Sequence, residues 1–223
     1  MKCLLCNQYQ PAGQNIFQLL GILERSEFLC ENCQASFEAI ESGYCDGCGR
    51  AEPDQVICSD CQRWRAKGMK LLQHRALYRY QTGMQDYMQA YKFQGDYELR
   101  KVFQKQMKGF IRKQQYDLLL PIPIAEKTWK CRGFNQVEGM LEGQKYALLL
   151  AVAQAEKISQ SLHNRQDRIK QAQPFLLKNP EQVAGKRILL VDDVYTTGRT
   201  LYHAADLCWQ AGAKSVRSIS LAR

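Results

Sequence analysis

The sequence predicts an α/β protein in which a small metal-binding module precedes a larger domain with a parallel, doubly wound sheet. Residues 1–68 contain four C-x-x-C pairs, which is metal-ligand spacing. Residues 117–122 and 188–191 form brief apolar runs without alternation, which is typical of strands buried on both faces of a parallel sheet. Each run precedes a polar loop and a helical pattern, as in strand–helix units. We expect the second domain to span residues 69–223, after a linker at 64–68.

The composition restricts the class of protein and its compartment. At 223 residues and 45% apolar content, one ordinary domain and one small domain can each form. No run of about 18 apolar residues occurs, so we expect no membrane span. The cysteine in the opening Met-Lys-Cys belongs to a motif, so we expect no removable leader and a cytoplasmic protein, which reaches the membrane only through partners.

The net charge of +9 is unevenly distributed. Residues 1–68 carry 6 Lys and Arg against 9 Asp and Glu, whereas residues 69–223 carry 25 against 13, a net charge of +12. The basic half is a candidate partner for polyanions, and charge that serves only solubility is the alternative.

Eight of the ten cysteines form the four C-x-x-C pairs. Two such pairs complete a tetrahedral zinc site, whereas disulfides fit a cytosolic chain poorly. The pairs repeat like a duplication, which favours two sequential sites, and an interleaved pairing stays open. Four ligands for each ion leave no open position, so both zinc ions are expected to be structural. The predicted ligands are Cys3, Cys6, Cys30, Cys33, Cys45, Cys48, Cys58 and Cys61.

Residues 69–116 predict a strand near 74–80 and two helices, one from Gly83 and one from Glu98. The second helix is amphipathic, and a row of basic residues lies on one of its faces. These residues, with one lysine of the turn at 92–96, are candidate contacts for DNA phosphates, and a solvated surface is the alternative: Lys92, Lys101, Lys105 and Lys108. Aromatic residues of this region could stack on bases, although helical spacing favours a core role.

The loop after residues 117–122 concentrates positive charge. It reads AEKTWKCRGFNQ and contains Lys127, Lys130 and Arg132 within six residues. Ligands bind at the carboxyl ends of parallel strands. We therefore expect Lys127 and Arg132 to supply cations to a pyrophosphate, beside the loop that follows 188–191.

Residues 187–201, RILLVDDVYTTGRTL, carry the central motif. Asp192 and Asp193 follow the apolar run, and a small polar loop then leads into a helix that stops at Gly212. Small residues at a helix N-terminus leave N–H groups for an anion. The two carboxylates need another partner, either a sugar diol or a cation such as Mg²⁺. Together the two parts predict a site for a ribose 5-phosphate.

Two other interpretations of this motif fail. A Walker B strand requires a G-x-x-x-x-G-K-[ST] loop, which the sequence lacks. The acidic pocket of a receiver domain follows the first strand of its domain, whereas only about one helix and one strand fit after Asp193. VDDVYTTGRT resembles the signature of type I phosphoribosyltransferases. That resemblance implies that Asp192 and Asp193 hold the ribose hydroxyls, and that the 5-phosphate is held by Thr196, Thr197, Gly198, Arg199 and Thr200.

Four motifs in order across essentially the whole chain resemble the ComF family of competence proteins, most closely its streptococcal members. They are the four C-x-x-C pairs, K-F-x-G-D, P-I-P with R-G-F-N-Q, and V-D-D-V-x-T-T-G-x-T. The resemblance implies a zinc module fused to a type I phosphoribosyltransferase-like domain. It also implies a role in DNA uptake during natural transformation, where the protein works with a helicase-like ATPase on incoming single-stranded DNA.

The resemblance leaves the catalytic residues unknown, with Mg²⁺ and phosphoribosyl pyrophosphate as candidate ligands. Lys127 stands where many family members have arginine, so a bidentate contact becomes a point charge. Thr196 stands where purine salvage enzymes of this fold carry an aspartate base, which argues against 6-oxopurine salvage. An active phosphoribosyltransferase that acts on another nitrogen nucleophile remains the alternative function.

The segment 159–173 is polar and basic and lacks an apolar face. In the resembled fold, a mobile loop covers the site at this place. Its candidate ligand contacts are Gln160, Arg165 and Arg168, and a plain surface loop is the alternative. Residues 147–152 fit a strand or a helix equally well, and residues 215–221 predict a closing strand.

Overall fold

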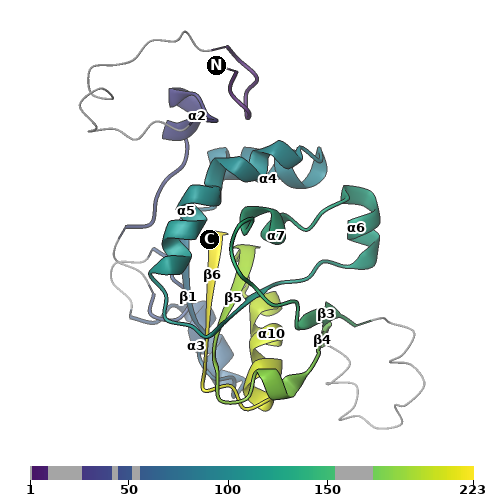
Figure 1. Cartoon of the computed structure of the whole chain (residues 1–223). Coiled ribbons are helices and arrows are strands. Elements are labelled where there is room, and N and C mark those ends of the chain that lie inside the picture. Colours follow the sequence, from purple (N-terminus) through teal and green to yellow (C-terminus); the bar gives the residue numbers. More distant parts are fainter. Residues whose placement is uncertain (1, 10–26, 42–44, 52–55, 154–172) are drawn as a thin grey trace.

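The protein is built around a four-stranded sheet with the order β1-β6-β5-β2, in which every pairing is parallel. The strands are β1 (Gln73–Tyr78), β6 (Ser215–Ala222), β5 (Arg187–Val194) and β2 (Leu118–Pro121). Figure 1 shows β5 and β6 side by side at its centre. The structure, a computed structural model, describes residues 2–9, 27–41, 45–51, 56–153 and 173–223. The predicted parallel sheet is confirmed.

Alternate residues of β5 point to opposite faces of the sheet and enter two separate cores. Leu189 and Val191 join the core formed with α4 (Thr82–Phe93), α5 (Arg100–Arg112) and α7 (Gln136–Met140). Ile188 and Leu190 join the core formed with α10 (Arg199–Gln210) and the pair of strands β3 (Leu150–Val152) and β4 (Phe175–Leu177). The other elements are η1 (Tyr97–Leu99), α6 (Glu126–Arg132) and η2 (Pro180–Gln182). Helices on both faces explain why residues 188–191 of this strand are all apolar.

The cysteine-rich segment, which contains α2 (Glu31–Ala35) and α3 (Ser59–Ala66), contacts both cores of the sheet. Cys3 and Cys30 pack into the core of α4 and α5, whereas Cys45, Cys48, Cys58 and Cys61 pack into the core of α10. Residues 38–40 run beside β1 and cover its open edge, with Ile40 N donating to Leu77 O over 2.9 Å. The boundary between residues 68 and 69 stays a prediction.

Two local expectations were wrong. The predicted linker at 64–68 is helical in part, because α3 continues to Ala66 and the Trp64 ring stacks on Tyr202 at 4.2 Å. The basic loop after β2 contains a short helix, α6, which ends at Gly133 in the left-handed region. Residues 150–152 form a strand that pairs with β4, which settles the open choice there.

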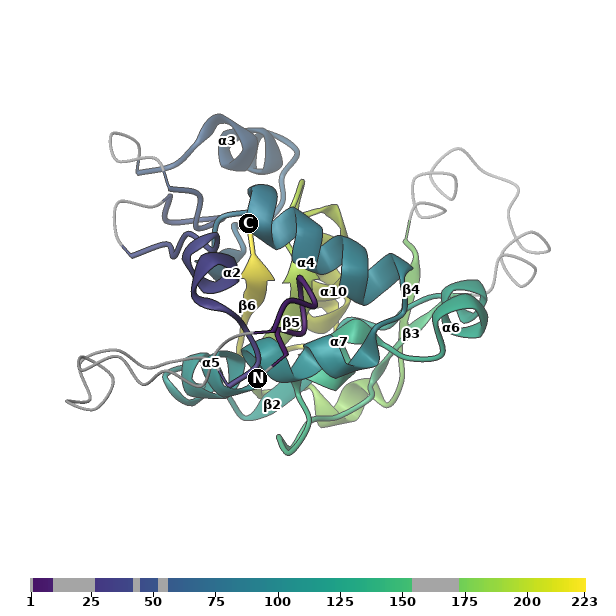
Figure 2. The ribbon, with the colours of Figure 1, turned by 90° about the horizontal axis from the view of Figure 1, so that it is seen from above.

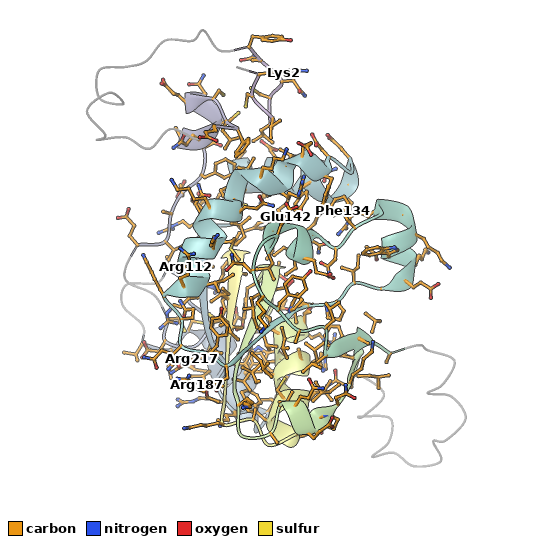
Figure 3. The ribbon with its side chains drawn as sticks, in the orientation of Figure 1. Lys2, Arg112, Phe134, Glu142, Arg187 and Arg217 are labelled. Atoms are coloured by element: carbon orange, nitrogen blue, oxygen red, sulfur yellow. The ribbon has the colours of Figure 1, made fainter. Side chains whose placement is uncertain are left out.

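The carboxyl ends of the strands define the edge at which we expect a ligand. Figure 2 looks onto this edge, with α3 and α6 at opposite sides of the molecule. In Figure 3, Arg187 and Arg217 lie at the other end of the sheet, far from Phe134 and Glu142. None of the helices in the described part of the chain combines the length and apolar character needed to cross a bilayer.

Candidate functional site

The acidic pair lies within β5, near its carboxyl end, and both side chains are buried. The Asp193 carboxylate is held from two sides. The Lys92 ammonium, from the last turn of α4, lies 2.8 Å from Asp193 Oδ1, and the Gln136 amide donates to Asp193 Oδ2. Asp192 Oδ1 accepts the Asp193 backbone N–H over 2.9 Å. Within the described residues, Asp193 therefore has an ion pair, whereas the neighbouring Asp192 has none.

The string R-G-F-N-Q, residues 132–136, lies beside the acidic pair and contacts Asp193 through Gln136. Arg132 donates to the carbonyl of Lys92 over 2.9 Å and to the Gln136 side chain. Gly133 ends α6 with φ 81°, and the Phe134 ring stacks on Tyr91 at 5.2 Å. Asn135 caps α7 by accepting the Val137 N–H over 2.9 Å, which turns Gln136 toward Asp193.

The loop after β5 offers a row of unpaired backbone donors. Within the described residues, no hydrogen bond is recorded for the N–H groups of Thr196, Thr197 or Gly198. Gly198 has φ 78° and precedes α10, whose dipole favours an anion at this end. A Cβ atom on Gly198 would lie 2.1 Å from the Tyr195 hydroxyl, so only glycine fits. The loop therefore has backbone donors and a helix end that an anion could contact.

Cationic residues of the second loop line a cavity of about 470 Å³ between α4 and α6. Lys92, Lys127 and Arg132 line it, together with the exposed Phe93 ring and Cys131. Arg132 and Lys92 also contact the groups that hold Asp193. A connected network of hydrogen bonds and one ion pair therefore joins Arg132 of the second loop to Asp193 at the carboxyl edge of the sheet.

Burial and the neighbouring Asp193 carboxylate raise the pKa of Asp192 to about 7. A sugar diol donates two O–H groups and binds best when Asp192 is ionised. We therefore expect the affinity for ribose 5-phosphate to increase as the pH rises through about 7. Calorimetric titrations across this range check the result. The phosphate group of the ligand also titrates, with a second pKa of about 6. The Asp192→Asn variant is therefore the control, because it keeps this titration and removes that of Asp192. A dependence as steep in that variant would contradict the assignment.

The eight cysteines form two sequential clusters, as predicted, and the interleaved alternative is wrong. Cys3, Cys6, Cys30 and Cys33 form one cluster, and the sulfur atoms within each cluster lie within 4.8 Å of one another. The other consists of Cys45, Cys48, Cys58 and Cys61. Its Sγ–Sγ distances of 3.5 and 3.7 Å match the edge of about 3.8 Å expected for thiolates about 2.3 Å from a tetrahedral zinc ion. The donor sets therefore fit a metal ion in each cluster.

The two clusters differ in burial and charge. All four cysteines of the second cluster are fully buried, whereas Cys6 of the first is exposed. A hydrogen bond from Cys61 and the Arg223 guanidinium lower the pKa of Cys48 to about 5. The same hydrogen bond raises the pKa of Cys61 well above its ordinary value, because Cys61 keeps the shared proton. The second cluster is thus prepared to carry negative charge beside an arginine.

The other predicted residues lie on α5, on α4, at the start of α10 or outside the described residues. Lys101, Lys105 and Lys108 lie on α5, and Lys101 pairs with Glu98 over 2.5 Å. Lys92 lies on α4 and pairs with Asp193, so its ion pair competes with the predicted DNA contact. Gln160, Arg165 and Arg168 lie outside the described residues. Arg199 and Thr200 begin α10 and are exposed.

Comparison with known proteins places the chain in a family. Residues 144–223 match the model of the phosphoribosyl transferase domain. The matched stretch includes the acidic pair and the loop at residues 196–200, which we call the phosphate loop. The chain is 36% identical to "Competence protein ComFC" of Streptococcus pneumoniae (strain ATCC BAA-255 / R6) over 223 residues, covering 100% of both chains. The chain belongs to the ComFC family of competence proteins. A second ComFC protein, from Bacillus subtilis (strain 168), is 31% identical over 228 residues, covering 99% of this chain and 94% of that one.

The resemblance in sequence is thus confirmed at the level of the ComFC family, and the α/β fold is that of a phosphoribosyl transferase domain. Among solved structures, the allosteric regulatory enzyme of purine biosynthesis is 20% identical with a TM-score of 0.36. That match covers 52% of this chain and 24% of the enzyme.

Three residues of the site could not be singled out from the sequence. Gln136 belongs to the distinctive R-G-F-N-Q string, which was the available signal, but the string alone does not indicate an acidic partner. Trp64 donates to Thr197 O over 3.3 Å from a segment predicted as a linker. Arg223 donates to Thr196 O over 3.1 Å and has no surrounding motif.

Proposed function

We propose that the chain binds a phosphoribosyl ligand at the carboxyl edge of the sheet and handles single-stranded DNA during natural transformation. One observation carries the first part. A buried acidic pair and three backbone N–H groups, which have no hydrogen-bond partner among the described residues, lie within residues 192–198 at one strand end. A ribose diol suits the carboxylates, and a 5-phosphate suits the loop. Phosphoribosyl pyrophosphate, bound with Mg²⁺, contains the same sugar phosphate, and its pyrophosphate group would extend toward Lys127 and Arg132.

The site has a direct test. Ribose 5-phosphate, the smallest probe with both recognition groups, is titrated calorimetrically into the metal-loaded protein. Binding of ribose 5-phosphate in preference to ribose supports the proposal, whereas no binding of ribose 5-phosphate or phosphoribosyl pyrophosphate contradicts it.

We further infer that each cysteine cluster holds one structural zinc ion. Four thiolates are a donor set that zinc prefers, and they leave no position for a substrate. Cys33 N donates to Cys30 Sγ over 3.3 Å, and Cys58 N donates to Cys45 Sγ over 3.2 Å. Such N–H donors stabilise charged sulfur atoms. Zinc therefore supplies folding free energy to a segment that is too short for a large core of its own.

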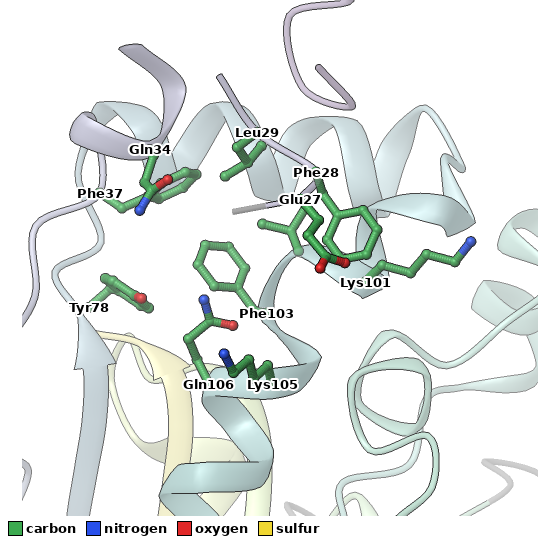
Figure 4. A pocket seen from close by; sticks show the side chains of 11 residues that line it. Glu27, Phe28, Leu29, Gln34, Phe37, Tyr78, Lys101, Phe103, Lys105 and Gln106 are labelled. Carbon is green, nitrogen blue, oxygen red and sulfur yellow. The ribbon is translucent and has the colours of Figure 1, made fainter. Parts of the chain in front are cut away.

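The proposed DNA surface lies on α5. Lys101 and Lys105 border a cavity of about 400 Å³ whose other walls include Phe37, Tyr78 and Phe103 (Figure 4). Lys108 is exposed one turn further along the helix. Phe103 is buried and Phe37 packs edge-on against it at 5.0 Å, so this surface would bind single strands through their phosphates. This surface supports DNA handling on the cytoplasmic side, next to a helicase-like ATPase that would move the strand.

Replacing Lys101, Lys105 and Lys108 with glutamine is expected to weaken single-strand binding uniformly across sequences. Each lost phosphate contact reduces the slope of log K against log salt by about 0.7, so the three together reduce it by about 2. Fluorescence anisotropy with a labelled oligonucleotide measures the slope. The control removes the same charge elsewhere, at the exposed Lys178, Lys186 and Lys214. An equal loss in both variants would mean that net charge alone attracts DNA.

The relatives' names support a role in competence, and a genetic test addresses it together with the site. A strain with Asp192→Asn should transform poorly if the phosphoribosyl site serves uptake. Co-purification with the competence ATPase tests the partner. The alternative function, a transferase, predicts pyrophosphate release from phosphoribosyl pyrophosphate with some nitrogen nucleophile. If no base in a panel causes pyrophosphate release while the ligand still binds, only the binding function is left.

A further inference from the structure

Arg223 lies between the second cysteine cluster and the phosphate loop and contacts both. It follows β6, whose register with β5 places it beside Tyr195. One guanidinium nitrogen donates to the carbonyls of Tyr195 and Thr196 over 3.3 and 3.1 Å. The other donates to Cys48 Sγ over 2.8 Å. The guanidinium also lies 4.4 Å from the centre of the Tyr195 ring, so one side chain joins a metal ligand to the loop.

A second contact reaches the next carbonyl of the loop. Trp64 lies in α3, the helix that also carries Cys61. Its indole N–H donates to Thr197 O over 3.3 Å, and its ring stacks on Tyr202 of α10 with an interplanar angle of 16°. The carbonyls of Tyr195, Thr196 and Thr197 are therefore all held from the side of the second cluster.

Holding these carbonyls fixes the donors on the other side of each peptide plane. In a trans peptide the C=O of one residue and the N–H of the next point in opposite directions, and the described residues contain no cis peptide. The three N–H groups that follow belong to Thr196, Thr197 and Gly198, the donors without recorded partners. They therefore face away from the cluster and toward the anion site.

We propose that Arg223 is a positioning residue through which a metal ion in the second cluster keeps the phosphate loop in its binding conformation. This rests on the proposed phosphoribosyl site. Four thiolates with one divalent ion carry a charge of about −2, which attracts the guanidinium and keeps it in place. Loss of the ion frees Cys48, releases Arg223 and lets the peptide planes rotate.

Coupling between two sites is reciprocal, so the ligand must also hold the metal ion. The first measurement uses the unaltered, zinc-loaded protein. Zinc transfer to a chromophoric chelator is followed with and without ribose 5-phosphate and without added Mg²⁺. We expect a faster phase from the first cluster, where Cys6 is exposed, and a slower phase from the buried second cluster. Because reciprocity concerns affinities, the chelator is added at a concentration that removes only part of the zinc. The ligand should then reduce the final amplitude of the slower phase only, as a roughly fivefold or greater rise in the zinc affinity of the second cluster requires.

Arg223→Met is expected to keep two zinc ions but to lose the effect of ribose 5-phosphate on the slower phase. Arg217→Met is the matched control, because Arg217 is an exposed arginine on β6 at the opposite end of the sheet (Figure 3). Trp64→Phe keeps the aromatic ring and removes one donor, so it should reduce the effect partly. Should Arg223→Met fail to fold, Trp64→Phe and the unaltered protein still decide the matter.

The possible failures can be told apart. If ribose 5-phosphate does not bind the unaltered protein, the phosphoribosyl site fails and the coupling with it. If it binds and leaves zinc release unchanged, the coupling alone is overturned. Retention of the full ligand effect in Arg223→Met would also overturn the role of Arg223.

Discussion

Cys61→Ser is expected to release one of the two metal ions and to detach residues 45–51 and 56–67 from the sheet. Cys61 is fully buried, and its three partners lie within 4.8 Å. A four-cysteine zinc site supplies about 10–16 kcal/mol of apparent folding free energy, which is comparable to the whole stability of about 5–15 kcal/mol of a typical domain. Because this cluster packs into the core of α10, its loss should also lower the thermal stability of the larger domain. Metal content and the unfolding temperature measure both effects.

Cys208→Ala is the matched control for this change. Cys208 is also fully buried, but it lies on α10 outside both clusters. We expect this variant to keep two metal ions. Cys6→Ser, in the more exposed first cluster, should lose one ion yet keep the α10 core. A Cys61→Ser protein that retains two ions and its unfolding temperature would refute a structural role for the second cluster.

Gly198→Ala is expected to abolish most of the affinity for ribose 5-phosphate. The left-handed conformation costs a non-glycine residue roughly 1–2 kcal/mol. The new methyl group would also lie 2.1 Å from the Tyr195 hydroxyl, and the Tyr195 ring is buried against His74 at 4.4 Å. The loop must therefore shift, and a loss of about tenfold or more in affinity follows from about 1.4 kcal/mol. Calorimetry measures the affinity, and circular dichroism checks the fold.

Gly185→Ala separates conformational strain from the clash. Gly185 has φ 70°, yet a Cβ atom there would meet nothing within 4 Å. We expect this variant to lose some stability and to bind ribose 5-phosphate normally. Equal loss of binding in the two variants would show that the alanine at 198 acts through general destabilisation.

Local patterns predicted the elements that depend on local physics. The apolar run before Asp192 predicted a strand buried on both faces, because a parallel sheet covered by helices leaves no polar face. The repeated C-x-x-C spacing favoured sequential pairing, because two pairs that are close in sequence can meet around one ion with little intervening chain. The acidic pair and the small loop were recognisable because their residue types match a diol and a phosphate.

The contacts that assemble the site come from distant parts of the chain. Lys92 was assigned to DNA because it belongs to a basic region, but the packing of α4 across the sheet brings its ammonium to Asp193. Gln136 depends on how α7 begins after Asn135. A lone arginine such as Arg223 carries no periodicity or motif, so only the register of β6 beside β5 shows its role.

The central claim is that one sugar phosphate binds the acidic pair and the loop together. Its most direct test is to titrate both ribose 5-phosphate and inorganic phosphate into the unaltered protein, Asp192→Asn and Gly198→Ala. We predict that Asp192→Asn loses affinity for ribose 5-phosphate but binds phosphate as before, whereas Gly198→Ala loses both ligands. Undiminished binding of ribose 5-phosphate by Asp192→Asn would contradict the claim, because the sugar would then not contact the carboxylates.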